Sequence, residues 1–323
     1  MRIIAIEEHI TTPLYAQKQA ETPRRRASMG DRSARVGHDV SAELLDVSNS
    51  RVAAMNDAGI DLQVLSMTMP GPQGLPPADA IAVARDANDR MAAAIQAHPS
   101  RFAAFAALPT PDVAAAIKEL ERTVTVLGFK GTMINGHTNG EFLDDKKYWP
   151  IFEAAQALAV PVYLHPREPH PGAAFYFDGY PEIATAACGF TVDTMIHFLR
   201  LIFAGVFDAF PKLTVILGHL GEGLPFYLDR IEDHTGIAAK RRGLKKTVAQ
   251  VMCENVVVTT SGNFSAPAFR CTLEMLGIDN IVFSVDWPYE SNKLGVAFLN
   301  QLGLAPADLE KLAHGNAERL LKL

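Results

Sequence analysis

Acidic and imidazole side chains follow short apolar segments of this sequence, in an arrangement that could bind a metal ion. Residues 3–6 lead directly into Glu7-Glu8-His9. Side chains alternate along a strand, so Glu7 and His9 would share one face and Glu8 would lie on the other. Burial of these groups without partners would cost several kcal/mol, so a nearby group must hold them. Three further apolar segments end in His165-Pro166-Arg167, His219-Leu220-Gly221-Glu222 and Asp286-Trp287-Pro288.

The candidate metal ligands are two carboxylates and two imidazoles. This set of oxygen and nitrogen donors suits Zn²⁺, Mn²⁺ or Fe²⁺ better than Ca²⁺ or a thiolate-preferring metal. A single histidine after an apolar segment is usually a packed or capping residue, and an acid opposite it could form a simple hydrogen-bonded pair. The same placement at several strand ends is hard to attribute to chance. We therefore expect a divalent metal site formed by Glu7, His9, His165 and Asp286.

The elements that must position these residues alternate between short β-branched or aromatic segments and longer helical patterns. Helices are expected to begin at Ser41, at Pro111-Asp112 and at Ser265, where the side chains can cap free N–H groups or proline fits the first turn. The alternation predicts a closed (β/α)8 TIM barrel rather than an open doubly wound sheet, since no GxGxxG motif is present. The active site of such a barrel lies at the C-terminal ends of its strands. The expected strands are residues 3–6, 62–66, 102–107, 131–134, 162–164, 214–217, 256–259 and 281–285.

Composition argues against several classes of protein. The net charge of -6 and pI of about 5.9 give no whole-protein electrostatic reason to bind nucleic acid or an anionic membrane. The three cysteines form no CxxC pair, which argues against a disulfide framework and favours a reducing, cytoplasmic setting. Residues 190–210 are apolar but contain charged side chains, so a buried helix is expected there, with His197 packed inside it. We expect one domain over residues 1–323, with Arg24-Arg25-Arg26 in a solvated loop and Arg51 in a structural role.

Several longer segments resemble the amidohydrolase superfamily. The resemblance is strongest with its decarboxylase branch, the amidohydrolase-2 group, and within it with γ-resorcylate (2,6-dihydroxybenzoate) and 2,3-dihydroxybenzoate decarboxylases. It spans nearly the whole chain, and LGHLGEGLP and DWPYE are its most specific signals. The segments that carry it are AIEEH at 5–9, VPVYLHPREP at 160–169, PKLTVILGHLGEGLPFYLDRI at 211–231, VVVTTSGNF at 256–264 and FSVDWPYE at 283–290.

The resemblance implies a role for individual residues of this sequence. It implies that His219 is catalytic with Glu222 as its acidic partner, and that Arg230 reaches a neighbouring subunit's site in a homo-dimer or homo-tetramer. It places Phe190 and Tyr289 in the lining of the substrate pocket, although the γ-resorcylate decarboxylases that this sequence resembles carry Phe at the position of Tyr289. The metal ligands that it implies are Glu7, His9, His165 and Asp286.

One divalent metal ion per chain is expected, Mn²⁺ or Zn²⁺ with a slight preference for Mn²⁺. Hydrolytic relatives usually begin with His-x-His on the first strand and use a lysine of the fourth strand to bridge two metals. Here the first position is Glu7, and residues 131–134 contain no lysine.

The chemistry expected of these residues is decarboxylation of a small hydroxybenzoate-type acid, which could also run in reverse as a carboxylation. A metal can chelate the carboxylate and an ortho hydroxyl of such an acid. Direct loss of CO₂ would leave an aryl carbanion, so we expect Asp286 to protonate the ring carbon first. His219 and Glu222 would form an acid/base pair at the substrate hydroxyl. Glu222 could instead be an acid in the first turn of a helix.

Other functions remain compatible with the same ligands. A metal-dependent hydrolase of a lactone or amide would use the metal to generate hydroxide instead. A Zn²⁺-dependent decarboxylase of a semialdehyde acid is a second alternative. A catalytically silent barrel is disfavoured because it would have lost ligands that are all present here.

Overall fold

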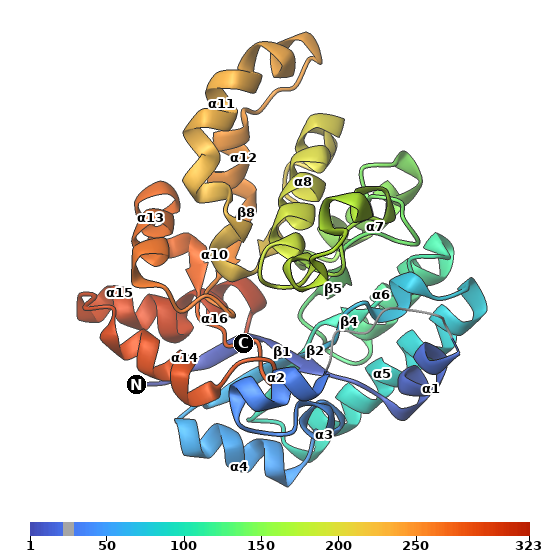
Figure 1. Cartoon of the computed structure of the whole chain (residues 1–323), viewed down its shortest axis with the longest axis vertical. Coiled ribbons are helices and arrows are strands. Elements are labelled where there is room, and N and C mark those ends of the chain that lie inside the picture. The colour runs from blue at the N-terminus through green and yellow to red at the C-terminus, as the bar shows by residue number, and fades with distance from the viewer. Residues whose placement is uncertain (22–28) are drawn as a thin grey trace.

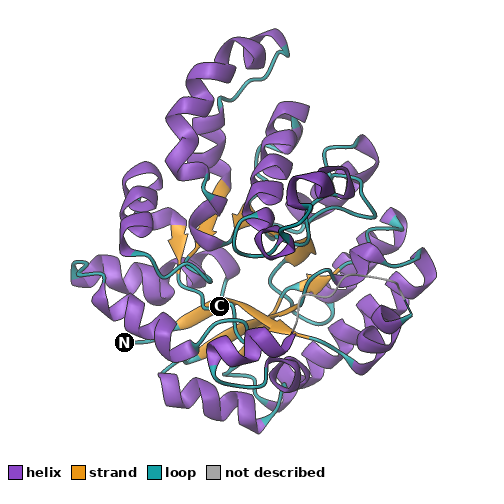
Figure 2. Ribbon diagram, in the orientation of Figure 1, coloured by secondary structure: helices purple, strands orange, loops and turns teal. Residues whose placement is uncertain are grey.

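Parallel strands surrounded by helices form the centre of the computed structural model, which describes residues 1–21 and 29–323 (Figures 1 and 2). The strands pair in parallel in two runs, β1-β2-β3 and β4-β5-β6-β7-β8-β9. β3 and β4 are two halves of the strand expected over residues 102–107, because the chain exchanges one neighbouring strand for the other at Phe105. The strands are β1 Ile4–Ile10, β2 Leu62–Met67, β3 Phe102–Ala104, β4 Ala106–Ala107, β5 Thr132–Asn135, β6 Val162–His165, β7 Val215–Leu217, β8 Val256–Thr259 and β9 Ile281–Val282.

The barrel closes between β1 and the segment that follows β9. His9 N donates to Trp287 O at 2.6 Å, and Asp286 N donates to Glu7 O at 3.0 Å. A parallel bridge between Glu8 and Trp287 completes the contact. With β3 and β4 counted as one strand, the expected (β/α)8 barrel is confirmed.

A β-bulge determines which side chains of β1 face the barrel interior. The expected strand ended at residue 6, but β1 continues to Ile10 and therefore contains Glu7. Ile6 belongs to the apolar cluster inside the barrel, so strict alternation would send Glu7 outward. The register with β2 shifts between Ala5 and Glu8, which lets Ile6 and Glu7 both face inward. Bulges commonly redirect side chains next to active sites.

Helices cover the outside of the barrel, and two of the expected helix starts are confirmed. Asp112 caps α6 by accepting a hydrogen bond from Ala115 N, and Ser265 caps α13 by accepting one from Ala268 N. The α-helices are α1 Pro13–Ala20, α2 Met29–Val36, α3 Val40–Leu45, α4 Asn49–Ala58, α5 Pro77–Ala97, α6 Val113–Thr125, α7 Trp149–Ala157, α8 Gly189–Ala204, α9 Val206–Ala209, α10 His219–Glu222, α11 Leu224–Arg241, α12 Val248–Asn255, α13 Ala266–Leu276, α14 Asn292–Gln301, α15 Pro306–Glu310 and α16 Asn316–Leu321. Shorter turns are the 3₁₀ segments η1 Gly71–Gly74, η2 Lys146–Tyr148, η3 Pro171–Phe177, η4 Pro181–Ala184 and η5 Ile278–Asn280, and the π segment η6 Lys311–Gly315.

The helix start expected at Ser41 is wrong, because the pattern forms two helices with a break between them. Asp39, not Ser41, caps α3, and its carboxylate accepts hydrogen bonds from the first N–H groups of that helix. In the break, Asp46 accepts hydrogen bonds from Ser48 N and Arg51 N, both at 2.8 Å. A short acidic side chain that bonds nearby backbone groups competes with helical hydrogen bonding.

Apolar side chains pack inside the barrel, among them Ile6, Phe105, Met133 and Tyr163.

None of the described helices is both long enough and apolar enough to cross a membrane. The Arg24-Arg25-Arg26 segment lies outside the described residues.

His197 is a packed histidine, as expected from the sequence. It is fully buried on α8, its Nε2 accepts a hydrogen bond from Leu143 N at 2.9 Å, and its ring lies 4.9 Å from that of Phe142. Burial, aided by the charges of His137 and Arg200, lowers the pKa of His197 to about 3. The imidazole is therefore neutral in the folded protein at every pH near 7.

We expect His197 to weaken the fold as the pH falls. In the unfolded chain its pKa returns to about 6.5, so below that value the unfolded state binds a proton that the folded state does not. Between pH 7.5 and pH 5 this lowers the free energy of unfolding by about 2 kcal/mol. His197→Gln keeps an acceptor near Leu143 N and removes the titration. Denaturant unfolding at both pH values should show a loss about 2 kcal/mol smaller in the variant; an equal loss in both proteins would contradict the assignment.

Candidate metal centre and active site

Four side chains from three parts of the barrel converge at its C-terminal end. Glu7 and His9 come from β1, His165 ends β6, and Asp286 follows β9. Each offers one ligand atom, and these atoms all lie within 4.8 Å of one another. The residues are the four that the sequence singled out as metal ligands.

The ligand atoms face one another, but several of them have no hydrogen-bond partner within the described part of the chain. His9 Nε2 lies 3.0 Å from Asp286 Oδ1 and 3.9 Å from Glu7 Oε1, and His165 Nε2 lies 3.1 Å from Glu7 Oε1. Among the described residues, Glu7 Oε1, His9 Nε2 and Asp286 Oδ1 are buried without a hydrogen-bond partner. Buried carboxylate oxygens left unpaired are costly, whereas a divalent cation would satisfy all of them at once. The donor set therefore fits a divalent metal ion.

The other atoms of these ligands are held in place. Glu7 Oε2 accepts hydrogen bonds from the hydroxyls of Tyr163, Ser261 and Thr259, so Oε1 is left for the metal. The hydroxyl of Ser66 lies 3.2 Å from His9 Nδ1, which directs Nε2 toward the carboxylates. Such outer hydrogen bonds orient metal ligands and are part of the site.

The sequence analysis missed these hydroxyl side chains. Tyr163 could have been found, because it precedes His165 by two positions on one strand and therefore shares its face. Thr259 and Ser261 follow the same rule relative to each other. Their contact with Glu7 crosses the barrel, and no local pattern in the sequence encodes it.

Burial opposes charge at this centre, and neighbouring charges overcome it. Burial alone would raise the pKa of Glu7, but the charge of His219 and the contacts with His165 and His9 hold this pKa well below its usual range. Burial would lower the pKa of His9, but the carboxylates of Asp286 and Glu7 outweigh it and raise this pKa to about 9. Without metal, protonated imidazole thus balances the carboxylates. Metal ions bind neutral imidazole, so loading the site would release protons.

His219 and Glu222 form a pair beside the ligand group. His219 Nδ1 lies 2.7 Å from Glu222 Oε1, and His219 Nε2 lies 3.7 Å from both Glu7 Oε1 and Asp286 Oδ2. Although burial opposes it, Glu222 and Glu7 raise the pKa of His219 well above its usual value. The pair is thus placed to hold a proton at the edge of the ligand group.

A left-handed turn brings the two members of the pair together. The labelled element α10 has positive φ at His219, Leu220 and Glu222, as well as at Gly221. Non-glycine residues in this conformation are strained, and such strain is concentrated at functional sites. Glu222 ends this turn two residues before α11 begins at Leu224, and its carboxylate contacts His219 within the turn.

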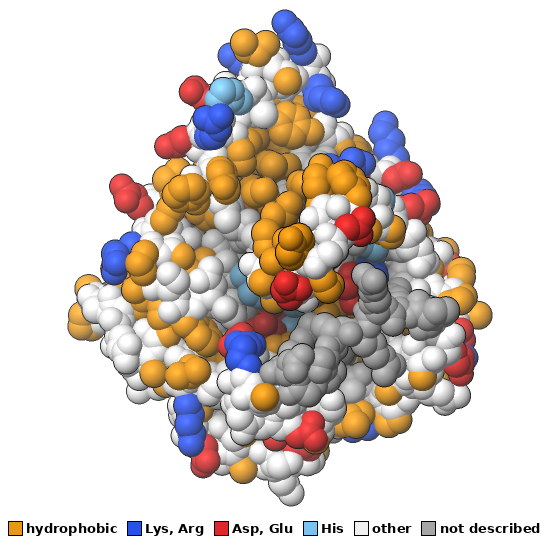
Figure 3. Space-filling view, viewed as in Figure 1, with side chains coloured by type: hydrophobic (Ala, Val, Ile, Leu, Met, Phe, Trp, Pro, Cys, Tyr) orange, Lys and Arg blue, Asp and Glu red, His pale blue; other side chains and the backbone are white. Residues whose placement is uncertain are grey.

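The residues expected to line the substrate pocket are placed unequally. The Tyr289 ring centroid lies 5.6 Å from that of His9, and its hydroxyl lies 2.5 Å from Thr68 Oγ1, so Tyr289 is at the centre. Phe190 is nearly buried at the start of α8, a helix that packs against α10. In Figure 3 histidine and acidic atoms reach the surface near the middle of the face shown.

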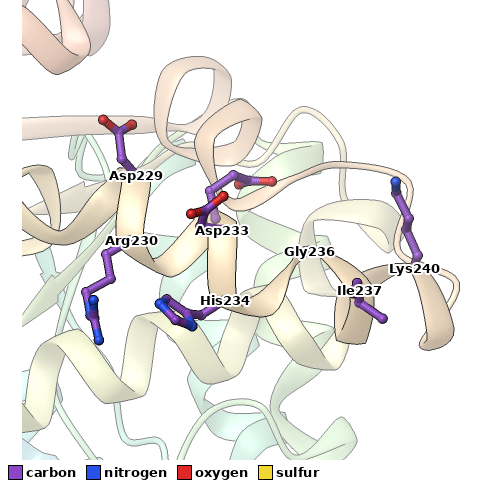
Figure 4. Close-up of a pocket in the computed structure, with 8 residues that line it drawn as sticks. Asp229, Arg230, Asp233, His234, Gly236, Ile237 and Lys240 are labelled. Carbon is purple, nitrogen blue, oxygen red and sulfur yellow. The ribbon is translucent and has the colours of Figure 1, made fainter.

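Arg230 does not join this group within the chain. It is exposed on α11, where it lines a surface hollow with Asp233 and His234 and extends on the same side of the helix as His234 (Figure 4). α11 projects at the top of Figure 1. A role for Arg230 in catalysis would therefore require a second chain.

Comparison with known proteins agrees with this geometry. A sequence profile of the amidohydrolase family matches residues 35–323. The γ-resorcylate decarboxylase of a Polaromonas species is 38% identical, over 88% of this chain and 90% of its own length.

Two crystal structures resemble the whole chain. One is a 2,6-dihydroxybenzoate decarboxylase in complex with 2,6-dihydroxybenzoate, with a TM-score of 0.90, 37% identity and 100% of both chains covered. The other is a dihydroxybenzoic acid decarboxylase of Polaromonas with bound manganese and the inhibitor 2-nitroresorcinol, with a TM-score of 0.90, 36% identity and coverage of 100% of this chain and 97% of the other. The chain therefore belongs to the amidohydrolase family, within the branch whose members are decarboxylases, that is, carboxy-lyases.

Proposed function

We propose that this enzyme is a metal-dependent decarboxylase of a hydroxybenzoate, with 2,6-dihydroxybenzoate as the first substrate to test. The observation that carries the proposal is the convergence of Glu7, His9, His165 and Asp286 beside the His219–Glu222 pair. The bound 2,6-dihydroxybenzoate and manganese named for its structural relatives support the substrate class and Mn²⁺ in preference to Zn²⁺. The proposal includes one ion per chain, a single domain and a cytoplasmic location.

The proposed reaction replaces the carboxylate of the ring with a proton. A divalent ion bound by the ligand group would withdraw charge from the substrate carboxylate and its ortho hydroxyl. Asp286 takes a proton from His219 and delivers it to the ring carbon that carries the carboxylate. The C–C bond then breaks, its electron pair returns to the ring, and CO₂ leaves.

The surrounding residues prepare this step. Glu222 fixes His219 through a 2.7 Å contact, and His219 Nε2 is close enough to Asp286 to exchange a proton through a small movement. His219 would orient the substrate hydroxyl and hold its proton. Tyr289 beside His9 would line the ring-binding space, with Phe190 as the second aromatic residue.

We further propose a homo-oligomer in which Arg230 serves a neighbouring site. Phe226, Tyr227 and Ile237 are exposed apolar side chains on the same projecting helix, and Figure 3 shows apolar surface in that upper region. Clusters of exposed apolar side chains commonly mark protein–protein contacts. A second copy that covered α11 would also bring Arg230 close to another chain.

Metal content and CO₂ release test the proposed reaction. Elemental analysis of protein purified without added metal should find one divalent ion per chain. Chelation should abolish CO₂ release from 2,6-dihydroxybenzoate and Mn²⁺ should restore it, because the proposed reaction needs a cation to withdraw charge from the substrate. Metal without CO₂ from this acid, 2,3-dihydroxybenzoate or salicylate, but with lactone opening, would favour a hydrolase. Absence of metal would contradict the site.

Two substitutions separate the proposed proton donor from its supporting pair. Asp286→Asn should lower kcat at least 1,000-fold, on the order expected when the reacting group is removed. Glu222→Gln should lower kcat about 100-fold, the lower end of what general acid–base catalysis contributes, because His219 itself remains. The matched control is Asp61→Asn, since Asp61 accepts a hydrogen bond from Ile3 N at the opposite end of the barrel. Turnover by Asp286→Asn at the control's rate would exclude Asp286 as the donor.

Mixing two inactive variants tests the role of Arg230. Asp286→Asn and Arg230→Ala should each be inactive alone. Refolded together, they should regain up to about a quarter of wild-type activity if random dimers form, because one mixed site has an intact Asp286 and a neighbour's Arg230. Mixed oligomers confirmed by mass but without activity would show that Arg230 does not act between chains.

A further inference from the structure

Glu8 lies between two metal ligands in the sequence but points away from them. It is fully buried outside the barrel wall, where Gln63 Nε2 donates to its Oε2 at 3.2 Å. The same Gln63 Nε2 lies 3.5 Å from Asn292 Oδ1 on α14. Neither the metal centre nor the proposed reaction uses this carboxylate directly. A buried glutamate facing away from the site therefore needs another explanation.

The contacts of Glu8 surround Asp286 on both sides. Its Oε1 accepts a hydrogen bond from Val285 N at 3.1 Å, and its Oε2 accepts one from Trp287 N at 3.2 Å. Asp286, between these two peptides, has a φ of +78°, which is unusual for a residue with a side chain. One carboxylate thus holds the backbone before and after a strained metal ligand.

Ser284 makes the complementary contact in the opposite direction. Its hydroxyl accepts hydrogen bonds from Ile6 N at 3.1 Å and Glu7 N at 2.6 Å, and it donates to Glu8 Oε1 at 3.2 Å. These two N–H groups belong to the bulge of β1. Ser284 thus accepts hydrogen bonds from the backbone of β1, and Glu8 of β1 accepts hydrogen bonds from the backbone on both sides of Asp286.

This exchange occurs where the regular sheet ends. β9 stops at Val282, so the seam between β1 and the Asp286 segment depends on few backbone hydrogen bonds. Arg51, fully buried, donates to His9 O at 2.5 Å and so supports the backbone of β1 beside the seam. The seam separates the Glu7–His9 pair from Asp286, so its geometry sets the distance between the ligands.

We propose that Glu8 is a positioning residue of the metal centre, which fixes Asp286 relative to Glu7 and His9 from outside the barrel. The inference rests on the proposed metal site. Glu8 contacts neither metal nor substrate, and it acts through the Val285 and Trp287 peptides. Ser284 fixes the same seam from the other strand.

The test compares metal affinity with stability in matched variants. In Glu8→Gln, an NH₂ group replaces one of the two oxygens that accept a backbone N–H. In Glu8→Asp, the side chain is too short to reach both peptides. The control is Glu119→Gln, since Glu119 is another nearly buried carboxylate, which joins Asn88 and Arg122 between α5 and α6. For each protein, the Mn²⁺ dissociation constant is measured by titration of metal-free, folded protein, and the melting temperature is measured without metal.

We expect both Glu8 variants to bind Mn²⁺ about 10–100-fold more weakly, the usual effect of losing an outer hydrogen bond at a metal site. Glu119→Gln should melt at a lower temperature with unchanged Mn²⁺ affinity. Ser284→Ala provides a second test if the Glu8 variants do not fold, and it should weaken Mn²⁺ binding in the same direction.

The outcomes distinguish the inference from the proposed function. If wild-type protein binds Mn²⁺ and the Glu8 variants bind it equally well while melting at lower temperature, Glu8 is only structural and the inference is wrong. If the Glu8 variants do not fold and Ser284→Ala keeps wild-type affinity, the inference is also wrong. If wild-type protein binds no Mn²⁺ or Zn²⁺, the metal centre itself fails.

Discussion

The burial of Glu7 and Asp286 side by side is the constraint on which the rest of this structure depends. Glu7 is fully buried and the Asp286 side chain is only 14% exposed, so the two carboxylates repel each other and lose most of their hydration. Imidazoles surround them, and three hydroxyls take up the second oxygen of Glu7. The oxygens that remain unpaired all point to one place. The site thus concentrates negative charge where a divalent cation is the simplest partner.

Two departures from regular backbone geometry create that concentration of charge. The bulge in β1 turns Glu7 into the barrel after Ile6, and the left-handed turn at 219–222 brings His219 onto Glu222. Each departure is stabilised by contacts from a neighbouring strand, since Ser284 accepts hydrogen bonds from the bulge and Ser261 Oγ accepts one from His219 N. Local strain at the site is therefore maintained by the regular structure around it.

Much of the barrel and the metal ligands could be predicted from the sequence because both depend on local signals. Apolar segments of strand length alternate with helical patterns, and His165 and Asp286 follow such segments directly. The bulge could not be predicted, since residues 5–8 contain neither glycine nor any other mark of irregular pairing. The left-handed turn was equally hidden, because only part of it is glycine. The break after α3 was missed because the Asp46 carboxylate accepts hydrogen bonds from the backbone N–H groups of Ser48 and Arg51, and helical periodicity does not reveal such contacts.

The closure of the barrel joins residues near the start of the sequence to residues near its end, and this affects how the protein can be made. Glu7 and His9 are synthesised before all the other strands of the barrel, whereas Asp286 follows the last strand, β9. On the ribosome, the early ligands would exist for most of synthesis without their partner or the Ser284 hydroxyl that supports the bulge. A complete metal site can form only when the last strand has closed the barrel. The complete ligand set therefore exists only in chains whose barrel has closed, and a metal bound to all four ligands would favour those chains.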